Sequence, residues 1–372
     1  MVQNLELNKK YKKKIRLAII GGSFDSTIGK THLRSLLSTN AYEIICGCFS
    51  RNKTKNKKNS KFYSLSKKKI YNTIKELLKH EYKNIDLALV LTPPKNRHKI
   101  YLELANRKVG IIAEKPFENN RKDAIKSFNL IRNKKIFFAS TYNYLGYPAV
   151  MEIKHLIKNI GQIRNFVFEM PQQSSTFYKS VIKNWRTHDD NIPNLHLDLA
   201  SHLLSMVYFF FDELPSEVNS FEQSNKIYKD NVYAWLKFKK FIGQFWYSKN
   251  STGKNNELSI RIFGEKGSIE WNHSQTEQII YCDNKGNKAI LNRLSQNSKY
   301  LRDNELFTYS SGHPGGFLDA FINIYDFIAK SYHSKRIEPN ILINLKTNLD
   351  IMKTLDKIHE SAIKKTWKKV IL

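Results

Sequence analysis

Short apolar runs alternate with stretches of helical spacing in the first part of the chain, and this alternation limits the possible folds more than any other feature. The apolar runs lie at residues 15–20, 42–49, 85–91, 109–113 and 135–140. Strands that are apolar along their whole length are covered on both faces, and strands that alternate with helices form parallel sheets. The sequence therefore predicts an α/β domain with a doubly wound parallel sheet.

A different pattern follows. Helical spacing at residues 148–159 and 195–211 gives way to several strand-like segments between residues 217 and 293, and two helical stretches close the chain. This order predicts an α+β domain with one mostly antiparallel sheet. At about 150 residues per domain, 372 residues suit two domains, which we expect at 1–141 and 142–372.

The chain has a formal net charge of +29, from 62 Lys and Arg residues against 33 Asp and Glu residues. Such a charge can indicate a nucleic-acid or membrane partner. Here the lysines are spread along the sequence and accompany abundant Asn, Ile, Tyr and Phe, whose codons are AT-rich, so we attribute the charge to compositional bias and expect no nucleic-acid partner. The densest basic run, residues 51–69, is predicted to be a solvated loop that could also attract a phosphorylated ligand.

Other features exclude further classes of protein. The three cysteines, Cys46, Cys48 and Cys282, are too few for a disulfide scaffold or a four-thiolate zinc site, and we expect no metal. No apolar stretch approaches the ~18 residues of a transmembrane helix, so no membrane insertion is expected. Residues 1–14 are polar and lack the apolar core of a signal peptide, which predicts a cytoplasmic location.

A glycine-rich turn, Gly21-Gly22-Ser-Phe-Asp-Ser-Thr-Ile28-Gly29, follows the first apolar run and leads into a helical stretch. Glycines let the backbone turn tightly, and the N-terminus of the helix then presents N–H groups to a pyrophosphate. The turn is longer than the G-x-G-x-x-G pattern, so a purely structural turn is the alternative. We expect Gly21, Gly22, Ile28 and Gly29 to bind a dinucleotide.

The second apolar run ends at Phe49-Ser50-Arg51, without a carboxylate nearby. Dinucleotide sites usually have an acidic residue here for the adenosine ribose hydroxyls. Ser50 and Arg51 would suit a ribose phosphate instead, which favours NADP over NAD. The alternative, that Arg51 only begins the basic run, is equally open.

The third apolar run ends at Thr92-Pro93-Pro94, and His98 follows within the next turn of chain. Ligands in doubly wound sheets bind beyond the carboxyl ends of the strands. Thr92, Pro93 and His98 are therefore candidate cofactor-binding residues, and a simple proline-rich turn is the alternative.

The fourth apolar run ends at Glu114-Lys115-Pro116. A lysine ammonium at this edge can hold and polarise a hydroxyl oxygen during hydride transfer. We expect Glu114 and Lys115 to border the cofactor and Lys115 to be catalytic, with an ordinary surface lysine as the alternative.

Asp198 and His202 lie four residues apart in a very apolar helical stretch, and this spacing places both on one helix face. A carboxylate can orient a histidine that moves a proton, and histidine titrates near neutral pH. The alternatives are a helix cap with a core histidine, or two zinc ligands for which no convincing third ligand is found.

In their order along the chain these motifs resemble the Gfo/Idh/MocA family, the glucose–fructose oxidoreductase and inositol dehydrogenase group. Matching segments continue through the second half: Asn143-Tyr144, Gly146-Tyr147-Pro148, Trp185-Arg186, residues 261–271 and Gly312-His313-Pro314. The Trp-Arg, Ile-Pro and Gly-His-Pro elements look most like members associated with bacterial surface-polysaccharide synthesis.

This resemblance implies a Rossmann domain followed by an α+β domain with an open sheet that often forms homo-oligomers. It implies a nicotinamide cofactor, NAD or NADP, and hydride transfer at a hydroxyl-bearing carbon of a sugar or nucleotide sugar. Lys115 would contact the substrate oxygen, and His202, with Asp198 beside it, would give and take the proton. The substrate-binding residues would be Asn143, Tyr144, Trp185, Arg186 and His313.

Three functions are consistent with the sequence. The first is an NAD(P)-dependent sugar oxidoreductase. The second is a redox-neutral enzyme of the same fold, which oxidises a sugar carbon transiently and so achieves elimination or epimerisation. The third is a non-catalytic nucleotide-binding protein, against which the joint presence of Lys115, Asp198 and His202 argues.

Overall fold

The computed structural model describes residues 11, 13–50, 52–173, 189–224, 229–334 and 341–372. Contacts within the chain divide it into two compact units. The first unit comprises Met1–Glu118, Lys122–Asn143 and Leu318–Asn348, and the second comprises Asn119–Arg121, Tyr144–Phe317 and Leu349–Leu372. The chain thus returns to the first unit near its C-terminal end, whereas the sequence predicts a single division at residue 141.

The first unit contains a five-stranded parallel sheet in the order β2-β1-β3-β4-β5. Its strands are β1 (Ile15–Gly21), β2 (Tyr42–Cys48), β3 (Leu87–Leu91), β4 (Gly110–Ala113) and β5 (Phe138–Ser140). All residues of β3 and β4 are buried, as expected for strands covered on both faces. The predicted doubly wound parallel sheet is confirmed.

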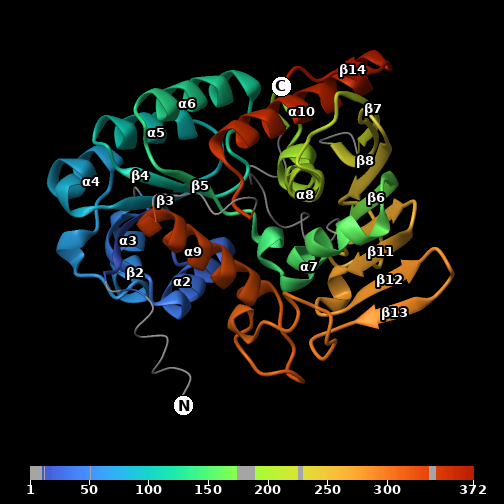
Figure 1. Ribbon diagram of the computed structural model, residues 1–372. Helices are drawn as coiled ribbons and strands as arrows, with labels where there is room; N and C mark the ends of the chain where they lie inside the picture. The colour runs from blue at the N-terminus through green and yellow to red at the C-terminus, as the bar shows by residue number, and fades with distance from the viewer. Residues whose placement is uncertain (1–10, 12, 51, 174–188, 225–228, 335–340) are drawn as a thin grey trace. The chain divides into compact units, whose positions relative to one another are not determined.

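Helices cover both faces of this sheet, with α5 and α6 on one face and α2, α3 and α9 on the other (Figure 1). The helices of this unit are α2 (Thr27–Thr39), α3 (Lys53–Phe62), α4 (Ile74–Glu81), α5 (Arg97–Asn106), α6 (Arg121–Asn133) and α9 (Phe317–Ser334). Helix α9 comes from the far end of the sequence, and the Tyr42 hydroxyl at the start of β2 donates a hydrogen bond of 2.7 Å to its Tyr325 carbonyl oxygen.

The basic run at 51–69 is not a loop, and this prediction was wrong. Its residues form α3 and a short 3₁₀ turn. Asn52 caps α3 by accepting a hydrogen bond of 3.0 Å from the Lys55 N–H, and Asn56 and Asn59 are buried on the inner face. The buried face is made of amides instead of apolar side chains, so hydrophobic periodicity could not reveal the helix.

Helix α3 supports the glycine-rich turn. The Asn59 side-chain oxygen accepts hydrogen bonds from the Phe24 N–H at 2.7 Å and from the Ser23 hydroxyl at 3.2 Å. The hydroxyl of Tyr63, just beyond the helix, donates to the Gly22 carbonyl oxygen. The basic segment therefore fixes the backbone of the turn.

The second unit is built on a nine-stranded sheet in the order β13-β12-β11-β10-β6-β9-β8-β7-β14. Its strands are β6 (Ile163–Pro171), β7 (Glu217–Ser224), β8 (Lys229–Lys237), β9 (Ile242–Ser248), β10 (Ser259–Gly264), β11 (Gly267–Asn272), β12 (Ile279–Asp283), β13 (Lys288–Leu291) and β14 (Lys368–Lys369). Neighbouring strands are antiparallel except for β6 and β9. The predicted open, mostly antiparallel sheet is confirmed.

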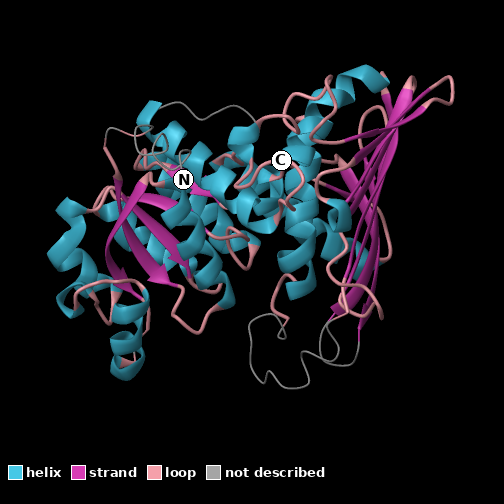
Figure 2. Cartoon of the chain, turned by 90° about the horizontal axis from the view of Figure 1, so that it is seen from below, coloured by secondary structure: helices cyan, strands magenta, loops and turns pink. Residues whose placement is uncertain are grey.

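One face of this sheet packs on helices and the other is open (Figure 2). Phe168 of β6 and Phe210 of α8 (Ser201–Phe211) meet edge to face at 5.9 Å on the covered side, next to α7 (Pro148–Leu156) and α10 (Leu345–Lys364). On the open side Phe221, Trp235 and Ile242 are exposed. Within the described residues, no helix has the length and apolar character needed to cross a membrane.

The hydrogen bonds of Asn59 lead to a first prediction. The Asn59→Ala variant should lower the free energy of unfolding by about 1–3 kcal/mol, because the Phe24 N–H loses its acceptor. Denaturant unfolding measures the change. Lys61→Ala, at an exposed position of the same helix, serves as the control and should stay within about 0.5 kcal/mol of the parent. Equal stability of the two variants would contradict the supporting role of α3.

Candidate cofactor and catalytic site

The order of the five strands reverses between β1 and β3, and ligands of doubly wound sheets bind at such a point, beyond the carboxyl ends of the strands. The last residue of β1, Gly21, is in register with Leu91 at the end of β3. Its φ of +84° and the 2.9 Å that would separate an added Cβ from the Thr92 nitrogen both require glycine. The glycine-rich turn and Thr92-Pro93 therefore flank the switch point.

Gly29 brings the first turn of α2 against the strand. A Cβ at Gly29 would lie 2.6 Å from the Gly22 carbonyl oxygen, so the helix and the turn can approach this closely only without one. Ser26 caps the helix by accepting a hydrogen bond of 3.2 Å from the Gly29 N–H. The N-terminal end of α2, where Ile28 lies, carries the positive end of the helix dipole and suits an anion.

The end of β2 has no acidic side chain before Glu76 in the sequence. Ser50 caps the following segment: its hydroxyl accepts a hydrogen bond of 3.0 Å from Asn52 and its carbonyl oxygen accepts one of 2.7 Å from the Asn56 side chain. Arg51 lies outside the described residues. The segment after β2 is therefore basic, and a carboxylate near it, that of Asp25 in the glycine-rich turn, is paired with Lys55 at 2.7 Å.

The side chain of Arg97 connects the loops that follow β3 and β4. The sequence patterns did not indicate this role. The side chain is almost completely buried, and its Nε donates a hydrogen bond of 2.9 Å to the Thr92 carbonyl oxygen. The same guanidinium donates to the carbonyl oxygens of Glu114 and Pro116. Arg97 directly precedes the candidate residue His98 in the sequence, which could have drawn attention to it. Only the fold shows that the Arg97 side chain binds the loops after both strands. The Lys115–Pro116 peptide bond is cis.

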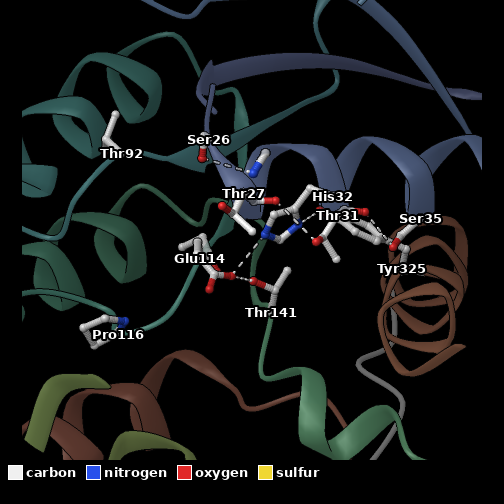
Figure 3. A network of polar contacts seen from close by, with 12 residues as sticks. Ser26, Thr27, Thr31, His32, Ser35, Thr92, Glu114, Pro116, Thr141 and Tyr325 are labelled. Carbon is white, nitrogen blue, oxygen red and sulfur yellow. Dashed lines mark hydrogen bonds and ion pairs between the residues drawn. The ribbon is translucent and has the colours of Figure 1, made fainter. Parts of the chain in front are cut away.

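Glu114 is a buried carboxylate with several hydrogen-bond donors (Figure 3). His32 Nε2 lies 3.3 Å from its Oε2, and the Thr141 hydroxyl donates to the same oxygen. Burial alone raises the pKa of Glu114, but His32, the nearby charge of Lys115 and Thr141 outweigh it, so the pKa is lowered and the group is ionised. An ionised carboxylate only accepts, so the His32 Nε2 carries a proton and its Nδ1, 2.6 Å from the Tyr325 hydroxyl, is available as an acceptor.

Lys115 is buried beside this carboxylate. A buried ammonium is costly unless opposite charge or hydrogen bonds compensate it, so Glu114 is a source of that compensation. His98, by contrast, lies 3.5 Å from Asp123 of α6. The structure thus brings Glu114, Lys115 and Thr92 together through Arg97 and pairs His98 with a neighbouring helix.

Several buried polar atoms of the first unit have no hydrogen-bond partner among the described residues. The Thr92 hydroxyl and the side-chain nitrogen of Asn143 are among them. Buried polar atoms are nearly always satisfied, so these two, which follow β3 and β5, are candidates for contact with a ligand. Together with the glycine-lined turn and the N-terminus of α2, they fit the polar and anionic parts of a dinucleotide.

In the second unit, Asp198 is paired with a lysine that the sequence did not reveal. Lys249, just after β9, places its Nζ 2.7 Å from Asp198 Oδ2, and its side chain is only 2% exposed. Asp198 belongs to a π-helical turn, His196–Ala200, that leads directly into α8. π-helical turns are rare and often mark functional sites. Lys249 is about 50 residues away in sequence, so no local pattern could indicate the pair.

His202 lies one turn further on, at the start of α8, in a cluster of rings. Its imidazole contacts the Tyr144 ring edge to face at 4.8 Å, and the Tyr144 ring lies 5.4 Å from that of His273. The side chain of Asn256 donates a hydrogen bond of 3.0 Å to the Tyr144 hydroxyl, and burial raises the pKa of that hydroxyl to about 12. Tyr144 is therefore a neutral phenol at physiological pH.

His273 was also missed. Its pKa is lowered by burial, so it is neutral near pH 7. The Asn256 carbonyl oxygen, 3.2 Å from Nδ1, can only accept, so Nδ1 carries the proton. Nε2 then accepts the hydrogen bond of 2.8 Å from the Tyr147 hydroxyl. This network fixes the rings around His202 without adding charge.

The remaining expected substrate residues lie elsewhere. His313 is in an exposed turn with its Nδ1 3.4 Å from the Ser310 hydroxyl. Trp185 and Arg186 lie outside the described residues. The structure therefore assembles Tyr144, Asp198 and His202 in one region of the second unit and keeps His313 on the surface.

Comparisons with known proteins identify the family. A model described as the oxidoreductase family with an NAD-binding Rossmann fold matches residues 15–142. The model of the GFO/IDH/MocA C-terminal domain matches residues 150–270. The chain belongs to the GFO/IDH/MocA family of oxidoreductases. This confirms the family that the motifs resemble, and with it an NAD-binding first unit.

Individual family members agree with this assignment. "Uncharacterized oxidoreductase YfiI" of Bacillus subtilis is 25% identical, with 89% of each chain covered. Levoglucosan dehydrogenase of Pseudarthrobacter phenanthrenivorans is 20% identical, over 76% of this chain and 80% of that protein. The crystal structure of an inositol dehydrogenase homolog with NAD+ from Azotobacter vinelandii has a TM-score of 0.89 at 18% identity, covering 98% of this chain and 99% of the other. That likeness shows the shared fold.

The buried pair of Asp198 and Lys249 gives a second prediction. Lys249→Met should lower the free energy of unfolding by about 3–5 kcal/mol, because a buried carboxylate loses its countercharge. The double variant Asp198→Asn/Lys249→Met should be destabilised by less than the sum of the single variants. Denaturant unfolding of all four proteins measures this coupling, and strictly additive effects would show that the two charges do not depend on each other.

Proposed function

We propose that the chain is an NAD(P)-dependent dehydrogenase that acts on a hydroxyl-bearing carbon of a sugar or nucleotide sugar. The observation that carries the proposal is the buried Lys115 next to the ionised Glu114, at the strand ends of the NAD-binding unit. A buried ammonium at this edge is suited to a substrate oxygen. Levoglucosan dehydrogenase, a relative of this chain, supports a sugar-like substrate.

Each catalytic residue has a separate role. Lys115 donates a hydrogen bond to the substrate oxygen and stabilises the negative charge that develops on it. His202 takes the hydroxyl proton during oxidation and returns it during reduction. Asp198, whose charge is held in place by Lys249, provides a fixed negative charge near His202. When bound, the nicotinamide supplies the hydride chemistry, and the proposal requires Lys115 and His202 to reach the same substrate carbon.

The dinucleotide would be held by the residues around the switch point. Gly21, Gly22, Ile28 and Gly29 accommodate the pyrophosphate, and the free Thr92 hydroxyl offers a hydrogen bond beside Pro93. His98, in the first turn of α5, would support the Thr92-Pro93 loop. At the adenosine end the absence of an acidic residue after β2, together with Ser50 and Arg51, favours NADP over NAD.

The substrate would be bound by Asn143, Tyr144, Trp185, Arg186 and His313. The Asn143 side-chain nitrogen supports this, because it is buried and lacks a partner among the described residues. Arg186 suits a nucleotide sugar, whose diphosphate is anionic. A nucleotide-sugar substrate would place the enzyme in bacterial surface-glycan metabolism, in the cytoplasm.

The open face of the nine-stranded sheet would mediate a homo-oligomer. Phe221 and Trp235 are 57% and 42% exposed there, on adjacent strands of one sheet. Exposed large apolar side chains on a sheet face are typical of an interface. The same proposal includes a functional division of the chain. Residues 1–141 would bind the cofactor, and residues 142–372 would bind the substrate and form the oligomer interface.

The third prediction tests the catalytic roles. Lys115→Ala and His202→Ala should each lower kcat by about 100-fold or more while the circular-dichroism spectrum is unchanged, because each removes a group needed only in the transition state. The assay follows NADH and NADPH absorbance with a panel of sugars, cyclitols and nucleotide sugars. Native mass spectrometry of the purified protein first identifies a bound cofactor.

Two surface variants are the controls. Lys134→Ala and His80→Ala change the same residue types at exposed positions and should retain full activity. Near-parent rates in Lys115→Ala or His202→Ala would refute the mechanism. Product formation without net NAD(P)H would instead establish the redox-neutral reaction.

A further inference from the structure

Three potential metal ligands, none of which has a role in the proposed reaction, meet in the second unit. They are His196 from the π-helical turn, Glu222 from β7 and His359 from α10. His196 Nε2 lies 2.7 Å and His359 Nδ1 lies 2.9 Å from Glu222 Oε1. All three ligand atoms lie within 4.8 Å of one another.

The three side chains of this cluster differ in how far they are exposed to solvent. The His196 side chain is inaccessible, the Glu222 side chain is 2% exposed and the His359 side chain is 19% exposed. Three segments far apart in sequence thus place their polar ends at one point in the second unit, and His359 is the most exposed of the three side chains. An ion could enter past His359, and a water molecule could complete its coordination there.

We propose that His196, Glu222 and His359 bind one divalent transition-metal ion of the Zn²⁺ class. Two imidazoles and one carboxylate form a common protein ligand set for zinc, with a water in the fourth position. Ligand atoms around a tetrahedral zinc ion with bonds of 2.0–2.1 Å are about 3.4 Å apart. Small side-chain rotations from the present 2.7 and 2.9 Å contacts therefore make room for the ion.

A second layer of contacts supports the site. The Tyr247 hydroxyl lies 2.5 Å from His196 Nδ1, on the opposite side of the ring from Glu222. Without metal, Nε2–H donates to Glu222 and Nδ1 accepts from the hydroxyl. When Nε2 binds an ion the proton moves to Nδ1, which then donates to the Tyr247 oxygen, the arrangement usual for metal-bound histidines. Lys229, with Nζ 3.6 Å from Glu222 Oε2, competes for the carboxylate and lowers the affinity.

Metal binding would strengthen a part of the fold that positions Asp198. His196 precedes Asp198 by two residues in the π-helical turn, and Tyr247 precedes Lys249 by two residues along the same segment. An ion held by His196, Glu222 and His359 ties this turn to β7 and α10. The expected role is structural, and the site takes no part in the proposed hydride transfer.

The fourth prediction concerns metal binding by the full-length protein without an affinity tag. After treatment with EDTA and desalting, ZnCl₂ should bind with a stoichiometry of one per chain in isothermal titration calorimetry, and the melting temperature should rise with the ZnCl₂ concentration. Co²⁺ should give the visible absorption of a four-coordinate site.

Variants assign the ligands. His359→Asn, at the partly exposed edge, should fold normally and lose both the calorimetric signal and the Co²⁺ spectrum, and Glu222→Gln should do the same. His80→Asn removes an exposed histidine elsewhere and should behave like the parent. Absence of binding in the parent protein, or unchanged binding in His359→Asn, would overturn the proposal.

Discussion

The contact between the Gly22 carbonyl oxygen and Gly29 sets the geometry on which the first unit depends. An added Cβ at Gly29 would lie 2.6 Å from that oxygen, so a side chain there would require the backbone of the turn or of α2 to shift. Because the two elements meet this closely, the N-terminal end of α2 stands directly over the point where the strand order reverses. Helix α3 then fixes the turn through Asn59 and Tyr63. The proposed dinucleotide site therefore depends on the backbone more than on any charged side chain.

Each unit also contains a buried lysine next to a buried carboxylate. In the first unit Lys115 is next to Glu114, whose ionised state is maintained by His32 and Thr141. In the second, Lys249 lies 2.7 Å from Asp198. Ion pairs removed from water cost solvation energy that an apolar core would not, so their presence is weak evidence for stability and better evidence for function. The family assignment, to oxidoreductases with an NAD-binding Rossmann fold, agrees with a functional role for these charges.

The sequence predicted those features that depend on local pattern. Continuous apolar runs between helical stretches predicted the parallel sheet, successive strand-like segments in the second half predicted the antiparallel sheet, and glycines and prolines marked the strand ends. The sequence did not predict the features that depend on contacts formed only in the folded chain. Helix α3 buries amides, Arg97 binds two loops that are adjacent only in the folded chain, and the partner of Asp198 is about 50 residues away in sequence. The roles of Lys115 and His202 follow from family motifs and remain predictions.

Equilibrium binding of NADH and NADPH to the parent protein and to Gly29→Ala shows whether the close contact between the turn and α2 forms a dinucleotide site. Fluorescence titration should show that the parent binds at least one of the two dinucleotides. Gly29→Ala should bind at least about tenfold more weakly, a loss of about 1.4 kcal/mol, while its far-ultraviolet circular dichroism is unchanged. Failure of the parent to bind either dinucleotide, or equal binding by the folded variant, would contradict the account.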